Sequence, residues 1–202
     1  VDKTRNACTN APGCLVAAKL YLKFKDAKYL ADAKILCAYV NANILKSDYR
    51  VGEPPLTYTQ GTFGEACRQL YHITQEQSYM AIAEQVISYA FTSTRCTNKG
   101  FLRDEGTDMN QSIFKAVLIP YAVNLVLDDA ASGTVRNTLT LKLQDNAEAL
   151  RKNMDRTQWP AMYCNYYWGS SFNSANIASM GAQASGASLM EGVARLEAAQ
   201  AK

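Results

Sequence analysis

The 202-residue sequence is poor in the residue types that mark several common folds and chemistries. A single histidine, His72, argues against Ser-His-Asp and Cys-His catalysis. His72 falls in the last turn of an expected helix, where a positive side chain is favourable, and this position explains it without a catalytic role. Five prolines and eleven glycines are too few for an all-β sandwich with its many turns. No apolar run reaches the roughly 18–20 residues that a membrane span requires.

Charge is also scarce, and neither sign dominates. Lys and Arg number 21 and Asp and Glu number 18, so the net charge is only +3, spread evenly along the chain, which excludes a nucleic-acid binder. Hydrophobic residues make up 48% of the sequence and charged residues 19%, which excludes a disordered tail. We therefore expect one folded domain over residues 1–202 with a substantial core.

The six cysteines show no Cys-x-x-Cys spacing, so a zinc site is disfavoured and no metal or organic cofactor is expected. Cys37 and Cys67 fall on apolar helical stripes and are predicted to be buried thiols. The even count and the start at Val1 favour a processed chain that is secreted, periplasmic or on the cell surface. The cysteines left to pair with one another are Cys8, Cys14, Cys96 and Cys164.

An internal repeat with a period of 50 residues organises the first half of the chain. Apolar residues recur at helical spacing within each unit, and a short polar turn divides the unit into two helices. A third unit is fainter and is marked by Tyr121. The matching positions are Leu20/Leu70, Tyr21/Tyr71, Tyr29/Tyr79, Ala31/Ala81, Ala33/Ala83 and Tyr39/Tyr89.

The pattern predicts an all-α protein built from helical hairpins. The long loops between hairpins, at 46–60, 93–108 and 156–173, are rich in aromatic residues, whereas the loops inside hairpins are short. Such asymmetry is typical of a toroid of hairpins with a binding face at one end. Helices are expected near residues 11–25, 27–45, 61–73, 76–92, 109–130, 136–155 and 174–199.

Small polar clusters precede the first helix of each hairpin. N-capping alone explains each cluster, because Asn, Ser, Thr and Asp accept hydrogen bonds from the free N–H groups of a first turn. Taken together, the clusters would surround one opening with fixed polar groups among aromatic rings, which suits an uncharged polyhydroxyl ligand such as a sugar. The clusters span residues 6–13, 57–64, 106–111 and 170–174.

Three of these segments resemble glycoside hydrolase family 76, the endo-α-1,6-mannanases and related fungal cell-wall mannan transglycosidases. The order and spacing agree along nearly the whole chain, and the resemblance implies an (α/α)6 barrel and a retaining mechanism on α-1,6-linked mannose. The segments are Asn10-Ala11-Pro12 before Leu20-Tyr21, Tyr58-Thr59-Gln60-Gly61-Thr62-Phe63, and Asn110-Gln111-Ser112-Ile113-Phe114-Lys115.

The sequence departs from that family pattern in two ways. Thr59, Asn110 and Ala116 stand where the family has Asn, Asp and Gly. The adjacent catalytic aspartates of the family lie upstream of the Asn10 segment, where this sequence has no counterpart. The chain therefore resembles the C-terminal part of the fold, about three and a half hairpins, and these residues alone are not expected to hydrolyse mannan.

The resemblance also suggests residues for mannan or another oligosaccharide. One group would order the sugar units through hydrogen bonds and the other would provide stacking platforms. The ordering residues are Asn10, Tyr58, Gln60, Thr62 and Asp108, and the platforms are Trp159, Tyr163 and Trp168.

Other carboxylates of the sequence are candidates for a catalytic pair, because retaining glycosidases need two carboxyl groups about 5–5.5 Å apart. Asp128 and Asp129 are adjacent but follow a helix C-terminus at the far end from the polar clusters, so we interpret them as solvated. Asp104, Glu105 and Asp108 are better placed, although a solvated loop is the favoured interpretation for them as well.

Three functions remain open. The leading hypothesis is a glycosidase acting on α-1,6-linked mannan, with its catalytic aspartates upstream of this chain. The second is a non-catalytic mannan-binding module or an inactive paralogue. The third, a helical-repeat protein that binds other proteins, is disfavoured by the long aromatic loops.

A partial ring of hairpins would leave apolar stripes without neighbours. We expect exposed stripes on the first hairpin and on the last helix, so a missing N-terminal half or a second copy of the chain would be needed to cover them. The two stripes are Val16, Leu20 and Phe24, and Leu189, Val193 and Leu196.

Overall fold

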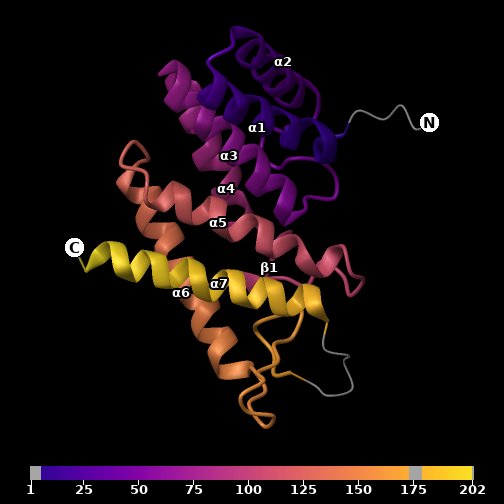
Figure 1. Cartoon of the computed structure of the whole chain (residues 1–202). Helices are drawn as coiled ribbons and strands as arrows, with labels where there is room; N and C mark the ends of the chain where they lie inside the picture. The colour runs from indigo at the N-terminus through magenta and orange to yellow at the C-terminus, as the bar shows by residue number, and fades with distance from the viewer. Residues whose placement is uncertain (1–5, 173–178, 202) are drawn as a thin grey trace.

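The computed structural model describes residues 6–172 and 179–201 and is all-α apart from one small hairpin of strands (Figure 1). A 3₁₀ turn, η1 (Gln111–Ile113), precedes α5, and two short antiparallel strands, β1 (Thr97–Asn98) and β2 (Phe101–Leu102), follow α4. The α-helices of the described residues are α1 (Ala7–Phe24), α2 (Ala27–Asn43), α3 (Thr57–Thr74), α4 (Gln77–Thr92), α5 (Phe114–Val126), α6 (Gly133–Asn153) and α7 (Met180–Gln200).

The 50-residue repeat corresponds to two hairpins with the same turn. Lys25 ends α1 and Gln75 ends α3, both in the left-handed conformation with φ near 60°, and each donates its N–H to the carbonyl of a tyrosine four residues earlier. Asp26 then caps α2 by accepting from Lys28 N, whereas Glu76 at the same place in α4 makes no side-chain cap. The predicted hairpins α1–α2 and α3–α4 are confirmed.

The first helices of the hairpins form an inner layer in which α1, α3, α5 and α7 lie side by side (Figure 1). These helices run parallel, as two contacts between α3 and α5 illustrate. Tyr58 at the start of α3 meets Phe114 at the start of α5, and Arg68 near the end of α3 meets Asp128 just beyond the end of α5. α2, α4 and α6 pack along the outside of this layer. The described part of the chain therefore forms three hairpins and a seventh helix, α7, without a hairpin partner.

Glycines allow α3 to approach two of its neighbours, α4 and α5, closely. A Cβ on Gly61 would lie 2.8 Å from the Cα of Leu118 in α5, and one on Gly64 would lie 2.4 Å from Ile87 Cγ1 in α4. The gaps between layers are filled by fully buried side chains, with Phe63 of α3 among the largest. Gly61 belongs to the Tyr58–Phe63 segment, so part of that motif serves packing.

Two expected helix starts need correction or lie outside the described residues. The helix expected at 109–130 begins as the 3₁₀ turn η1, whose first residue Gln111 donates its N–H to Asp108 Oδ1, and it continues directly as α5 from Phe114 to Val126. The helix expected at 174–199 is seen from Met180, and residues 174–178 lie outside the described part of the chain.

The prediction of exposed stripes is right at one edge and wrong at the other. Val16 and Phe24 in α1 are 56% and 58% exposed, and Leu20 is half-buried. The apolar stripe of α7 is buried, because α7 packs against α5 and α6. The buried residues of that stripe are Leu189, Val193 and Leu196.

Candidate functional site

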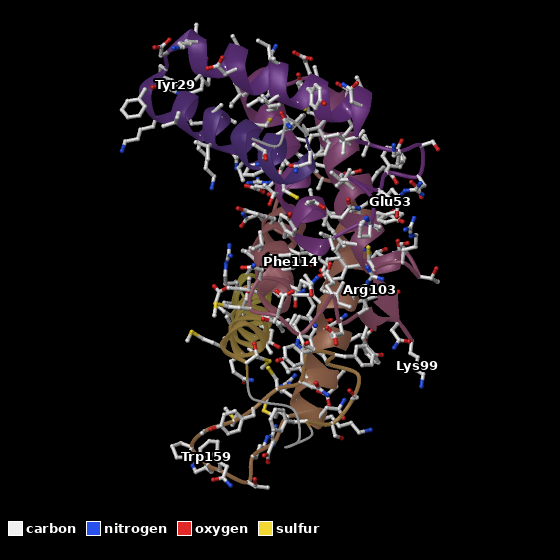
Figure 2. All side chains as sticks on the ribbon, turned by 90° about the vertical axis from the view of Figure 1, so that its right-hand side faces the viewer. Tyr29, Glu53, Lys99, Arg103, Phe114 and Trp159 are labelled. Atoms are coloured by element: carbon white, nitrogen blue, oxygen red, sulfur yellow. The ribbon has the colours of Figure 1, made fainter. Side chains whose placement is uncertain are left out.

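The face formed by the starts of the inner helices and by the long loops is shown in Figure 2, where Phe114 lies near the middle. Glu53 and Arg103 lie to one side of Phe114, and Trp159 lies at the far end of the 156–172 loop. Polar and aromatic side chains from three loops thus share one end of the helix array, as the loop lengths predicted.

Tyr58 links the starts of three helices. Its ring lies 4.4 Å from the ring of Phe114, centroid to centroid, and its hydroxyl donates to Cys8 Sγ at the start of α1. Burial raises the pKa of Tyr58, and the contact with Cys8 adds to this effect. Tyr58 therefore stays a neutral phenol, half-buried at the centre of the face.

Glu105, from the long loop between α4 and α5, caps α3. The N-cap residue Leu56 has no side chain that can cap, and Glu105 instead accepts from Thr57 N at 2.7 Å and from the Thr57 hydroxyl. Burial raises the pKa of Glu105, while the bonds from Thr57 and the charge of Lys115 oppose the rise. The interpretation of Glu105 as a solvated loop charge is wrong, because its carboxylate satisfies the first turn of α3. No sequence signal marked this pairing across 48 residues.

Lys115 is buried beneath the 156–172 loop. Its Nζ lies 4.1 Å from the centroid of the Trp168 ring and donates to the Tyr166 carbonyl. Burial lowers the pKa of Lys115 to about 8, and the negative charge of Glu105 opposes the shift. The ammonium group fixes the loop to the start of α5.

Trp168 is only 1% exposed and lies against Lys115, so its ring is part of the loop's own packing. Tyr163 is half-buried and stacks on Phe172 with 5.7 Å between ring centroids. Trp159 is 73% exposed, and Figure 2 shows it far from Phe114. The three predicted platforms do not form one surface, and sugar stacking by any of them stays a prediction.

The polar residues selected from the sequence hold the face together. Gln60 is fully buried, accepts from Val51 N at 2.5 Å and donates to Tyr49 O at 3.3 Å, which fixes the loop before α3. Asp108 Oδ1 accepts from Asn110 N at 2.8 Å and so caps η1. The capping interpretation therefore accounts for Asp108, while its carboxylate remains exposed.

Asn10 lies in the first turn of α1 and Thr62 in the second turn of α3. The side-chain amide of Asn10 donates to Asn6 O at 2.8 Å, within its own helix start, and stays half-buried. Thr62 is buried in α3. Of the predicted ordering residues, Asn10, Tyr58 and Asp108 are the ones that remain open to solvent at the face.

Asp128 and Asp129 lie at the opposite end of the inner helices. Asp128 is buried and accepts from Arg68 at 2.7 Å and from His72, so the expectation that it is solvated is wrong; Asp129 is exposed and pairs with Arg136. Burial alone would raise the pKa of Asp128, but the bonds from His72 and Arg68 hold it below its usual value. Asp128 therefore has a structural role, and both aspartates lie away from the face.

Residues 6–172 and 179–201 contain neither a metal-binding cluster nor a membrane-spanning helix. No cluster of three or more His, Cys, Asp or Glu side chains in that part of the chain could hold a metal ion. None of the described helices is both long and apolar enough to cross a bilayer. All six cysteines are free thiols, and Cys8 is the exposed one among them.

The sequence profile of the family described as glycosyl hydrolase family 76 matches residues 2–201. No protein in the curated set of sequences matches the chain.

Solved structures also match the chain over most of its length. The GH76A α-1,6-mannanase of Salegentibacter sp. superposes with a TM-score of 0.84 at 25% identity, over 95% of this chain and 60% of that one. An inactive variant of that enzyme, with two adjacent aspartates replaced and α-1,6-mannotetrose bound, gives 0.85 at 26% identity over 95% and 59%. A protein of Listeria innocua gives 0.82 at 23% identity, covering 96% and 56%, which shows the fold alone. The chain spans about 60% of the length of these mannanase structures.

Proposed function

Because the chain belongs to glycosyl hydrolase family 76, and so forms part of an (α/α)6-type barrel, we propose that it is part of an α-1,6-mannan hydrolase with a retaining mechanism. The catalytic aspartate pair is then supplied by a segment outside these 202 residues. The observation that carries this proposal is the placement of the one adjacent pair, Asp128 and Asp129, at the end of the array away from the face. The substrate assignment is supported by the mannanase neighbour with α-1,6-mannotetrose bound.

A retaining hydrolase needs a carboxylate nucleophile and a second carboxyl group that first protonates the leaving oxygen and then activates water. In this proposal the described residues bind and orient the substrate. Tyr58 and Phe114 present adjoining rings at the centre of the face for a sugar's C–H surface, and Asn10 and Asp108 offer polar groups at its rim. Gln60, Lys115 and Trp168 shape the loops from beneath.

The experiment compares the 202-residue chain with a longer chain that carries an adjacent aspartate pair, each incubated with α-1,6-mannan and with a β-linked glucan. Only the longer chain is expected to release oligosaccharides, and only from the mannan. Release from the glucan alone would overturn the substrate assignment. Turnover by the 202-residue chain, lost on Asp104→Asn or Asp108→Asn, would overturn the location of the catalytic pair.

A non-catalytic mannan-binding module is the second candidate. It is favoured by one observation: the carboxylates of Glu105 and Asp108, which lie near the face, are occupied in capping α3 and η1. Titration of the longer chain with mannotriose separates the two candidates. Binding without turnover by an aspartate-pair protein supports the module, whereas binding with turnover supports the hydrolase.

We also propose that the protein acts outside the cytoplasm, because polymeric mannan is an extracellular substrate class and the face is an open one. Fractionation of the native host, with detection of the protein in the medium or the cell envelope, tests this location. Recovery in the cytosolic fraction alone would overturn it.

A further inference from the structure

Three thiols meet where α1, α2 and α3 pack together. Cys14 of α1, Cys37 of α2 and Cys67 of α3 are all buried, and Cys14 and Cys67 are fully so. Their helices belong to two different hairpins, and α2 packs on α1 far more than on α3. A covalent bond here would therefore join elements that otherwise share little surface.

Cys37 interacts with both other thiols, and hydrogen bonding to Cys14 and then to Cys67 lowers its pKa. The sulfur atoms of Cys37 and Cys67 lie 3.9 Å apart, at van der Waals contact. Cys14 directs its thiol to the carbonyl of Ala33 at 3.3 Å and is held by that bond. Cys37 is the central thiol, and Cys67 is the neighbour that has no backbone acceptor among the described bonds.

We propose that Cys37 and Cys67 are a redox-modification site, which forms a disulfide between α2 and α3 when the protein meets a small-molecule disulfide such as oxidised glutathione. One cysteine thiolate attacks a glutathione sulfur and releases one reduced glutathione. The second thiolate then attacks the cysteine sulfur of the mixed disulfide and releases the other. The two protein thiols lose two electrons and two protons in total, and the glutathione disulfide accepts them as two thiols.

The position of the site at the edge of the array explains how a buried pair would react. Burial raises the pKa of Cys67, so the thiol is protonated and unreactive while the helices stay packed. The α1–α2 hairpin is the terminal hairpin of the described chain and has α3 as its inner neighbour on one side only. Brief opening of this hairpin exposes both thiols, and reclosing brings the sulfur atoms back together.

The test is incubation of the 202-residue chain with oxidised glutathione, followed by alkylation of free thiols and peptide mapping by mass spectrometry. We expect the mass of the chain to fall by about 2 Da. Two of the six cysteines should no longer be alkylated, and the cross-linked peptide should join Cys37 to Cys67. The oxidised chain should unfold at a temperature higher by on the order of 5 °C, which a reductant reverses.

Cys14→Ala and Cys67→Ala are matched variants, since each removes one buried thiol of the same trio. The Cys37–Cys67 bond should form in Cys14→Ala, and no Cys37–Cys67 bond can form in Cys67→Ala, so the rise in unfolding temperature should be lost there. If a variant fails to fold, peptide mapping of the oxidised parent chain still shows which cysteines are joined. Six free thiols after prolonged incubation, or a bond that joins any other pair, would overturn it.

Discussion

Lys115 holds a positive charge in an almost fully buried position, at a cost in free energy that depends on pH. Burial places its folded pKa at about 8, below the roughly 10.4 of an unfolded lysine. Between these two values the unfolded chain binds more protons than the folded chain. The contribution of Lys115 to stability therefore rises as the pH increases from about 8 to about 10, and it is least favourable below pH 8.

Comparison with Lys115→Met isolates this contribution, because the variant has nothing to titrate at that position. We expect the unfolding free energy of the parent, relative to the variant, to improve by about 2 kcal/mol between pH 7 and pH 9.5. Urea denaturation at both pH values measures it. A difference that stays constant with pH would show that Lys115 is not titrating in this range.

Asp128 shows the same sign of pH dependence in a lower pH range: burial alone would raise its folded pKa, but the bonds from His72 and Arg68 hold it below the usual value, so here the charged form is the stabilised one. Its contribution is fully present above the ordinary aspartate pKa of about 3.9 and is lost as the pH falls through the lower folded value. Asp128→Asn should cost about 3 kcal/mol at pH 7, since it leaves the buried Arg68 without one partner.

Asp129→Asn is the matched control for that substitution, because Asp129 is adjacent but exposed. It should change the unfolding free energy by less than about 0.5 kcal/mol. Acid titrations followed by circular dichroism should show a smaller loss of stability below pH 4 in Asp128→Asn than in the parent. Equal effects of both substitutions would contradict the structural role given to Asp128.

At the scale of elements, close packing of α3 on α5 depends on Gly61. A methyl group at this position would meet the backbone of Leu118 at 2.8 Å, and a backbone cannot rotate away as a side chain can. Gly61→Ala should therefore destabilise the chain by about 1–3 kcal/mol, which thermal unfolding can measure.

Gly133→Ala is the control for this prediction, since Gly133 begins α6 with nothing within 4 Å of an added Cβ. It should be neutral or slightly stabilising, because alanine loses less backbone entropy than glycine on entering a helix. If the two substitutions had the same effect, the interface between α3 and α5 would not be limited by backbone contact.

The elements were predictable where local chemistry repeats and unpredictable where distant segments decide. The 50-residue repeat indicated both hairpins because Lys25 and Gln75 occupy equivalent turns. The start of α5 was misplaced because Asp108 caps a 3₁₀ turn, which differs from an α-helical start only in hydrogen-bond geometry. The apolar stripe of α7 was expected to be exposed, because the spacing of its apolar residues does not predict which helices pack against it.

The candidate site divides in the same way. The sequence indicated which segments gather at one end, but it could not tell which polar side chains face outward. Gln60 and Trp168 are residue types that often bind sugars, yet both are buried. Gln60 is bonded to Val51 and Tyr49, and the Trp168 ring packs against Lys115. Glu105 was undervalued because its partner Thr57 is 48 residues away.

At the scale of the whole molecule, the described array ends in an uncovered edge. A groove of about 720 Å³ runs along α1 and α2, with Val16, Leu20 and Ile35 among the apolar residues that line it. Exposed apolar surface of this kind drives association. The earlier expectation of a missing segment or a second copy therefore stays a prediction for this edge.

Sedimentation of the 202-residue chain should show self-association that a charge in this groove suppresses. Ile35→Lys is expected to give a monomer, and Leu141→Lys is the control, because Leu141 is a similarly exposed apolar residue on α6 outside this groove. Monomers at every concentration in the parent chain would contradict the prediction.

The parallel arrangement of α1, α3, α5 and α7 has an electrostatic consequence for whatever binds at their starts. Each helix carries the equivalent of about half a positive elementary charge at its N-terminus, and the four fields add at one face (Figure 1). These N-termini favour the ionised form of a carboxylate brought to this face and so oppose the rise of its pKa on burial, as the bonds from Thr57 oppose it at Glu105. The acid/base carboxyl group must instead be protonated at first, which requires a raised pKa. The negative charge of a neighbouring nucleophile is the simplest cause of such a rise.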